Sequence, residues 1–114
     1  MAAKKRTYSR YTREAGVLLG KEIALGRKEH KWTERELASR AGISRATLQK
    51  IEKGDLSVAC GLVFEVAALV GVKLFEEEGS PLSLAGRIAH AENRLALLPS
   101  HVRKRRKTHI DDEF

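Results

Sequence analysis

Apolar residues recur every three or four positions along most of this chain, which is the spacing that one face of an α-helix produces. A first helix is predicted over residues 12–28, and its apolar face is expected to consist of Ala15, Leu19, Ile23 and Ala24. Three glycines within this segment lower its intrinsic helix propensity. We therefore expect this helix to depend on packing against the rest of the fold.

Two short helices joined by a tight turn are predicted between residues 33 and 53. Thr33 is the expected N-cap of the first, and Glu36 stands three residues later, which is a capping-box pattern. Gly42 follows the last turn, where a residue with positive φ is favoured, and Ser44 is the expected N-cap of the second helix. The positions expected to face the core are all apolar: Leu37, Ala38, Ala41, Ile43, Leu48 and Ile51.

A further helix is predicted from Ser57 to about Val70. Five apolar side chains are spaced for full or partial burial in it: Leu62, Val63, Phe64, Val66 and Leu69. Cys60, the single cysteine, lies in this apolar stretch and is expected to be a small buried hydrophobe. Residues 72–75 have the composition of a short strand, which would need a second copy of the chain to pair with.

The last predicted helix, residues 83–98, has a narrow apolar seam whose members are separated by four, three, four and three positions: Leu84, Ile88, Ala91, Leu95 and Leu98. This spacing is typical of coiled coils. Four helices already complete a domain before residue 80, so the additional seam needs a partner surface. We expect a homodimer that uses either this helix or the strand at 72–75.

Composition narrows the range of functions. The chain has 114 residues, a net charge of +7 and a pI of about 9.9, so it is attracted to polyanions, most often nucleic acid. It lacks a membrane-length apolar stretch and a secretory signal, and a cytoplasmic location is expected. Since it shows no metal-ligand cluster, nucleophile–base pair or phosphate-binding glycine loop, we expect no enzymatic activity, no metal and no cofactor.

The sequence from residue 19 to residue 75 resembles the helix-turn-helix domain of the lambda-repressor/Cro-like (XRE) family. The family pattern T-x-x-E-L-A-x-x-A-G-[IV]-S-x-x-T-L-x-x-I-E-x-G is matched in order from Thr33 to Gly54. This resemblance implies an all-α fold, namely a four- to five-helix lambda-repressor-like DNA-binding domain, here with an additional C-terminal amphipathic helix and charged tails. It also implies a transcriptional repressor that binds a double-stranded DNA operator.

The chain is accordingly expected to contain four segments. Residues 1–11 form a basic N-terminal arm, and residues 12–79 form the DNA-binding domain. Residues 80–98 form the amphipathic helix for dimer or partner contact, and residues 99–114 form a charged flexible tail. The arm either follows the DNA backbone or enters a minor groove, or it only raises solubility.

The resemblance also implies roles for individual residues. The base-contacting positions of the family's recognition helix are occupied here by Ser44, Arg45, Ala46 and Lys50, with Gln49 as an adjacent candidate. Arginine or lysine can donate to guanine O6 and N7, and an alanine can touch a thymine methyl group. The expected phosphate contacts are Thr33, Thr47 and Lys53, together with Lys4, Lys5 and Arg6 of the arm.

Two further positions bear on this interface. Glu34 stands where the family often has a glutamine that meets a phosphate, and a carboxylate there is repulsive. Either Glu34 turns toward its own helix N-terminus, where the helix dipole favours it, or the phosphate contact is missing. Arg27 and Glu52 are expected to form an ion pair that locks the first helix to the recognition helix, as in similar proteins.

Residues 56–75, which continue the domain, and residues 111–114 at the C-terminal end are similar to one branch of the family, the HipB-like antitoxins. These antitoxins are encoded beside HipA-like kinase toxins. This likeness implies a regulator that represses its own operon and holds a HipA-like kinase toxin inactive. The end of the tail is a candidate contact for that partner: Ile110, Asp111, Asp112, Glu113 and Phe114. The alternatives are a stand-alone repressor of a phage or mobile element, and a protein-docking module without operator-specific DNA binding.

Overall fold

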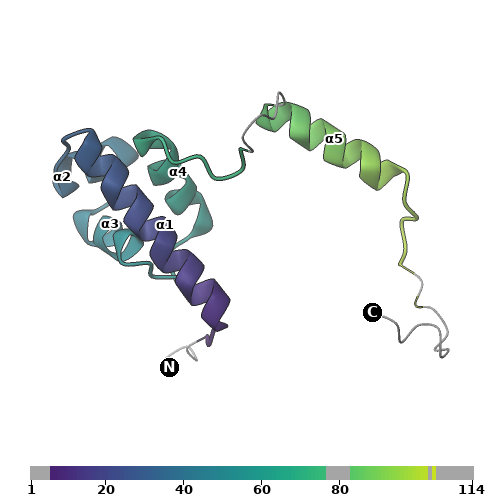
Figure 1. Ribbon diagram of the computed structural model, residues 1–114, viewed down its shortest axis with the longest axis horizontal. Coiled ribbons are helices and arrows are strands. Elements are labelled where there is room, and N and C mark those ends of the chain that lie inside the picture. The colour runs from purple at the N-terminus through teal and green to yellow at the C-terminus, as the bar shows by residue number, and fades with distance from the viewer. Residues whose placement is uncertain (1–5, 77–82, 103, 105–114) are drawn as a thin grey trace. The chain divides into compact units, whose positions relative to one another are not determined.

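In the computed structural model, which describes residues 6–76, 83–102 and 104, the chain is all-helical, with no strand in these ranges. The elements are α1 (Arg10–Glu29), α2 (Glu34–Ala41), α3 (Arg45–Glu52), α4 (Cys60–Val70) and α5 (Leu84–Ala96) (Figure 1). Two compact units divide the chain: residues 1–74 contain α1–α4, and residues 75–114 contain α5. The predicted all-α class is confirmed, and the predicted segment bounds stay a prediction.

The first unit has a core to which all four of its helices contribute. The buried apolar residues are Ile23, Leu37, Ala38, Leu48, Ile51, Val66, Ala67 and Val70. Helix α1 packs against α3 and α4, and α2 packs against the same two helices. Full burial of one Leu, Ile or Val side chain contributes roughly 1.5–3 kcal/mol, so this core holds α3 in a defined orientation.

Helix α1 begins two residues before the predicted start at residue 12. Ser9 is its N-cap, and the Ser9 Oγ accepts a hydrogen bond from the Thr12 amide at 3.2 Å. The helix ends at His30, and Lys31 then adopts a positive φ of 61° that turns the chain toward α2. Tyr11, assigned to the N-terminal arm from the sequence, is therefore helical.

The packed face of α1 includes two of the predicted residues, the buried Ile23 and the partly buried Leu19, together with glycines that lie against other helices. A Cβ on Gly20 would lie 2.6 Å from the Glu52 carbonyl oxygen, and one on Gly26 would lie 2.9 Å from the Val70 carbonyl oxygen. Ala15, predicted to face the core, is exposed. The prediction was wrong for Ala15 because close approach of α3 and α4 requires positions without a side chain, so glycines and not Ala15 lie at these contacts.

The α2–α3 pair has the predicted local structure. In the capping box, the Thr33 amide donates to Glu36 Oε1 at 2.9 Å, and the Glu36 amide donates to Thr33 Oγ1 at 3.1 Å. Gly42 ends α2 with a φ of 69°, where residues with a Cβ are disfavoured. Ser44 caps α3 by accepting a hydrogen bond from the Thr47 amide at 3.0 Å.

Helix α4 differs from its prediction at its start. Its N-cap is Ala59, without a side-chain cap, because the Ser57 amide and hydroxyl both donate to Asp55 Oδ1, at 2.8 and 2.6 Å. Ser57 therefore closes a turn before α4. Cys60 is the first residue of the helix and is exposed, so its predicted burial is wrong.

The buried face of α4 also differs from its prediction. Of the predicted positions Val66 is buried and Val63 and Leu69 pack partly buried against the core, but Leu62 and Phe64 are 37% and 43% exposed. The other buried residues are Ala67 and Val70. Because α4 is apolar nearly all round, its sequence does not specify which face is covered, and its packing against α1 and α2 makes that choice.

Residues 72–75 form no strand in the single chain, and the strand that would pair with a second copy stays a prediction. The Val72 amide donates to the Ala67 carbonyl at 2.9 Å, and the side chains of Val72 and Leu74 pack against the core. The apolar residues of this segment thus complete the first unit.

Helix α5 lies within the predicted range of residues 83–98. Ser83 is its N-cap, and its Oγ accepts a hydrogen bond from the Gly86 amide at 3.1 Å. The amides of Leu97 and Leu98 bond three residues back, so the helix ends in a tighter turn before Pro99. No residue of α5 is buried.

Candidate nucleic-acid interface

The outward face of α3 carries the residues predicted to contact bases. Leu48 and Ile51 are 0% and 3% exposed, and they fix the inward face of this two-turn helix. Successive residues are about 100° apart around an α-helix, so the remaining positions of the first two turns face away from the core. Ser44, Arg45, Ala46 and Lys50 are exposed and Gln49 is half-buried.

The first of these residues is engaged within the protein. The Ser44 hydroxyl accepts a hydrogen bond from the Thr47 amide and donates to Thr47 Oγ1 at 2.9 Å. Ser44 thereby caps α3 and presents the helix N-terminus, whose dipole favours anions. Because Thr47 Oγ1 is the acceptor in this pair, the Thr47 hydroxyl proton remains available as a donor.

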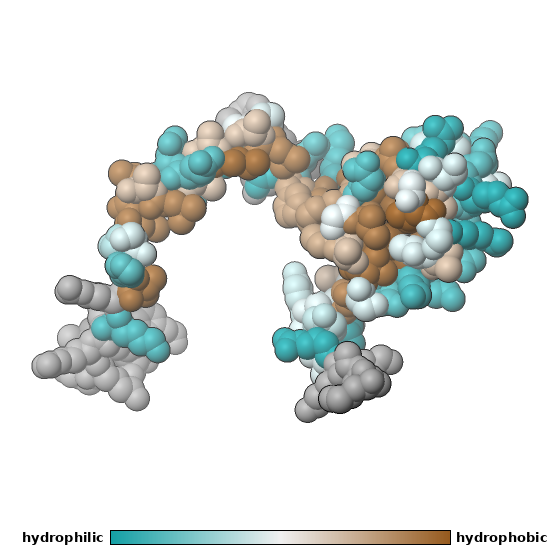
Figure 2. Space-filling model, turned by 180° about the vertical axis from the view of Figure 1, so that it is seen from behind, coloured by the Kyte–Doolittle hydropathy of each residue, from teal (hydrophilic) through white to brown (hydrophobic). Residues whose placement is uncertain are grey.

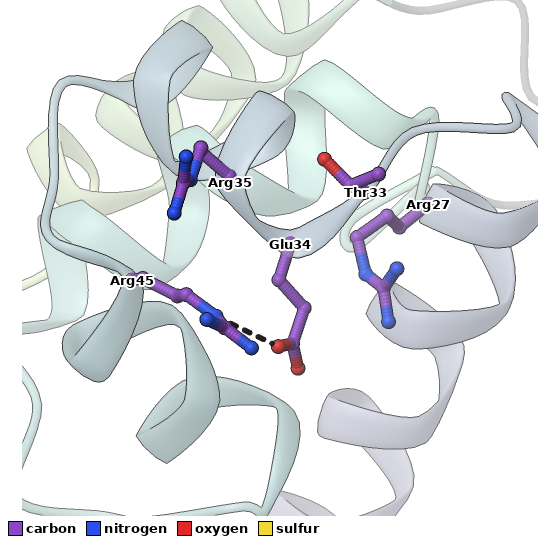
Figure 3. A pocket seen from close by; sticks show the side chains of 5 residues that line it. All are labelled: Arg27, Thr33, Glu34, Arg35 and Arg45. Carbon is purple, nitrogen blue, oxygen red and sulfur yellow. Dashed lines mark hydrogen bonds and ion pairs between the residues drawn. The ribbon is translucent and has the colours of Figure 1, made fainter.

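Glu34, the first residue of α2, reaches across to the outward face of α3. Its Oε1 accepts hydrogen bonds from Gln49 Nε2 and from Arg45 Nε, both at 3.2 Å (Figure 3 draws the contact with Arg45). These two bonds hold the pKa of Glu34 below its ordinary value, and the bond from Gln49 has the larger effect. Glu34 therefore does not turn toward its own helix N-terminus, the first of the two alternatives considered from the sequence, because its carboxylate faces α3. The other alternative, a missing phosphate contact, stays a prediction.

The contact with Glu34 restricts how Arg45 and Gln49 can point. Arg45 uses its Nε–H, and its two terminal Nη groups are not part of this bond. Gln49 uses one amide N–H and retains its second N–H and its carbonyl oxygen. A shared acceptor therefore holds both side chains in place while leaving donor and acceptor groups for a ligand.

A shallow hollow next to this contact is lined by Arg27, Thr33, Glu34, Arg35 and Arg45 (Figure 3). Arg35 was not among the predicted site residues. Its position in the first turn of α2, directly after Glu34, was the available signal. Arg27 is paired with Glu52 and Arg45 with Glu34, so Arg35 supplies the additional positive charge that makes the hollow attractive to an anion.

The ion pair between Arg27 and Glu52 is formed as expected and links α1 to α3. Arg27 Nε donates to Glu52 Oε2 at 2.8 Å, and Nη2 donates to Oε1 at 3.2 Å. The two side chains are 11% and 10% exposed, and Arg27 Nη1 also donates to the Trp32 carbonyl at 3.0 Å. The bonds to Glu52 raise the pKa of Arg27 against the opposing effect of burial. This pair fixes α3 to α1, and Arg27 lines the same hollow as Glu34.

Comparisons with known proteins agree with this geometry. The profile of the helix-turn-helix family matches residues 23–76. An uncharacterized HTH-type transcriptional regulator of Methanocaldococcus jannaschii is 40% identical over 45 residues, which is 40% of this chain and 68% of that protein. This chain belongs to the helix-turn-helix family. No solved structure matches it significantly.

Other predicted contacts of this helix-turn-helix protein lie around the same region or outside the described residues. Thr33 is exposed and caps α2, and Lys53 is exposed at the end of α3. The guanidinium carbon of Arg6, also exposed, lies 5.6 Å from the centre of the Tyr8 ring. The predicted contacts Lys4, Lys5 and residues 110–114 fall outside the described part of the chain.

The described residues contain neither a metal-binding cluster nor a membrane-spanning helix. Within them, no three His, Cys, Asp or Glu side chains gather closely enough to hold a metal ion. None of the helices described there has the length and hydrophobicity needed to cross a bilayer.

Proposed function

We propose that this protein is a DNA-binding transcriptional regulator that inserts α3 into the major groove of its operator. The observation that carries this proposal is the arrangement in which Glu34 holds both Arg45 and Gln49 on the outward face of α3. Membership of the helix-turn-helix family and the likeness to an HTH-type transcriptional regulator support it.

Each outward side chain of α3 has a role in this proposal. The terminal Nη groups of Arg45 donate to guanine O6 and N7, since its Nε is engaged with Glu34. The free N–H and carbonyl of Gln49 match the N7 and N6 edge of adenine. Ala46 contacts a thymine methyl group, and Lys50 donates to a second guanine.

Phosphate contacts surround these base contacts. In this proposal they come from the Thr47 hydroxyl, the Thr33 hydroxyl, the Lys53 ammonium and the guanidinium of Arg35, with the basic residues Lys4, Lys5 and Arg6 on the adjoining backbone. Such contacts set orientation and supply affinity for any sequence. The hollow beside Arg35 would receive a phosphate, while the Glu34 carboxylate is offset by its bonds to α3.

Substitutions at Arg45 test the reading role. Arg45→Ala is expected to cost roughly 1–3 kcal/mol of operator binding and to relax specificity at one base pair. Arg45→Lys is the matched variant: it keeps the charge but loses bidentate geometry, so specificity falls while the salt dependence is retained. Fluorescence anisotropy with the protein's own promoter fragment, over a range of salt concentrations, measures both effects.

Three results would contradict the proposal: a flat dependence of log affinity on log salt, an unchanged operator affinity in Arg45→Ala, or full specificity in Arg45→Lys. Lys53→Ala provides a further control. It is expected to weaken binding to operator and unrelated DNA by the same factor and to lower the salt slope by about one.

In the full proposal the protein is a homodimeric repressor whose two α3 helices read a palindromic site. A narrower version makes it the antitoxin of a HipA-like kinase toxin. This version is supported by the likeness of the sequence to HipB-like proteins and by the acidic, aromatic end at residues 110–114. A kinase-like reading frame overlapping this gene would support the antitoxin role, and its absence would favour a stand-alone repressor.

A further inference from the structure

Helix α5 has an apolar seam that nothing in the described part of the chain covers. Its four large members are all more than half exposed: Leu84 55%, Ile88 59%, Leu95 67% and Leu98 62%. Figure 2 shows hydrophobic surface along this helix. Because exposure of a continuous apolar stripe to water is unfavourable, the seam is a candidate contact surface.

The spacing of the seam assigns the residues of α5 to positions of a coiled-coil heptad, which are lettered a to g. With alternating steps of four and three, Ile88 and Leu95 occupy a positions and Leu84 and Ala91 occupy d positions, while Leu98 continues the spacing in the turn after the helix. The flanking g positions are then Arg87 and Arg94, and the flanking e positions are Ala85 and Glu92. In a two-stranded coil these flanking residues contact the other helix.

The charged flanking residues have no opposite charge within reach on their own helix. Arg87 has Ser83, Leu84, His90 and Ala91 three and four positions away, and Glu92 has only Ile88, Ala89, Leu95 and Ala96 there. Neither forms an ion pair within the described residues. The Arg87 Nη1 is moreover shielded from solvent without a hydrogen-bond partner among those residues.

We propose that α5 pairs with α5 of a second copy of this chain as a parallel two-stranded coiled coil. In a parallel pair a g residue faces the e residue five positions later on the other helix, so Arg87 of each copy meets Glu92 of the other. The two-fold axis produces this ion pair twice. This inference deepens the proposed function by naming the contact that forms the dimer. Only the role of the dimer in binding an operator rests on the proposed function.

The charges select the parallel arrangement over the antiparallel one. An antiparallel pair brings g residues against g residues and would place Arg87 against Arg94, which is repulsive. A parallel pair leaves Arg94 opposite Pro99, without a partner. In a parallel pair the two α5 helices also begin at the same end of the coiled coil. Both DNA-binding units are therefore attached at that end and can reach a single operator. With about two heptads the coil is short, and we expect a weak dimer in the free protein.

Charge reversal in the full-length chain tests this pairing by sedimentation equilibrium. Arg87→Glu and Glu92→Arg are each expected to weaken the dimer roughly 3- to 10-fold, because every ion pair becomes a like-charge pair. The double variant Arg87→Glu/Glu92→Arg restores opposite charges and should return to within about 2-fold of the wild type. Mixed in equal amounts, the two single variants should form heterodimers.

Arg94→Glu is the matched control, since it makes the same charge change one heptad later and should leave the dimer unchanged. Failure of the double variant to recover, or a tighter dimer for Arg94→Glu, would overturn the parallel pairing. A monomeric wild-type protein at high concentration, with a different protein covering α5, would overturn it as well. Binding of a single operator half-site, measured in parallel, reports on the DNA-binding function independently of the dimer.

Discussion

Helices α3 and α5 are both amphipathic and both begin at a capping serine, yet only α3 has a covered apolar face. Leu48 and Ile51 of α3 are almost completely buried, whereas every residue of α5 is outside the core. The difference shows that periodicity identifies an apolar face but does not identify what covers it. Within the first unit, α1 and α2 pack against α3 and supply the cover.

The polar contacts of the two helices differ in the same way. Helix α3 is bonded to α1 through Glu52 and to α2 through Arg45 and Gln49. The contacts described for α5 are those of its own backbone and of its cap at Ser83. Side chains on α3 are therefore held in a defined orientation, as a reading surface requires, while α5 keeps its seam and charges for another chain.

The largest expected effect comes from breaking the contact that fixes α3 to α1. Glu52→Ala leaves the Arg27 guanidinium without its partner at 11% exposure, and we expect the free energy of unfolding to fall by roughly 3–5 kcal/mol. The control is Glu14→Ala, which removes an ion pair whose side chains are 84% and 68% exposed and should cost less than about 0.5 kcal/mol. Urea denaturation compares the two, and equal losses would show that the Arg27 pair contributes no more than a surface pair.

Replacing one leucine of α3 and one leucine of α5 by alanine compares the covered and the uncovered helix directly. Leu48→Ala removes a side chain with 0% exposure and is expected to lower the free energy of unfolding by about 2–5 kcal/mol at any protein concentration. Leu95→Ala, at 67% exposure, should change the unfolding of dilute protein by less than about 0.5 kcal/mol. Its effect should appear as a weaker dimer at high concentration. A large loss for Leu95→Ala in dilute protein would mean that α5 is already covered there.

The smallest expected effect concerns the bond between α2 and α3 and depends on pH. The pKa of Glu34 is lowered from its ordinary value of 4.5 by its bonds to Gln49 and Arg45. The folded pKa is below the unfolded one, so these bonds stabilise the protein above pH 4.5 and are lost as the pH falls through the folded pKa. Thermal unfolding from neutral to acidic pH should therefore show a larger decrease for the wild type than for Glu34→Gln.

Glu36 provides an internal reference for this measurement. Its pKa is lowered by the amide and hydroxyl of Thr33 in the capping box, and it titrates in the same range in both proteins. The difference between wild type and Glu34→Gln therefore isolates Glu34. Parallel pH profiles for the two proteins would rule out a stabilising role for the contacts with Arg45 and Gln49.

Much of the candidate site could be predicted because its signals are local. The capping box of Thr33 and Glu36, the positive φ of Gly42 and the N-cap Ser44 all act through hydrogen bonds or backbone preferences within four residues. The predicted ends of α2 and α3 were accordingly right. The Arg27–Glu52 pair came from the family resemblance, since 25 positions separate the two residues.

The predictions that were wrong concern which side of a helix is buried, and not which segments are helical. Ala15 was expected to be buried, but α1 packs through Gly20 and Gly26 because only a missing side chain allows helices to approach that closely. Leu62 and Cys60 were expected to be buried, but α4 is apolar around much of its circumference and another face is covered. In α4 the neighbouring elements select the packed face, whereas in α1 the predicted Ile23 is buried and the glycines set the closest contacts.

The sequence by itself determined the helical class, the position of the α2–α3 turn and the absence of acidic residues at the outward positions of α3 itself, because each of these follows from residues a few positions apart. Only the tertiary structure decided that Glu34 holds Arg45 and Gln49, which are 11 and 15 positions away along the chain. That contact depends on the distance and angle between two helices. These in turn follow from the close glycine contacts of α1 and the shared core, which no local pattern specifies.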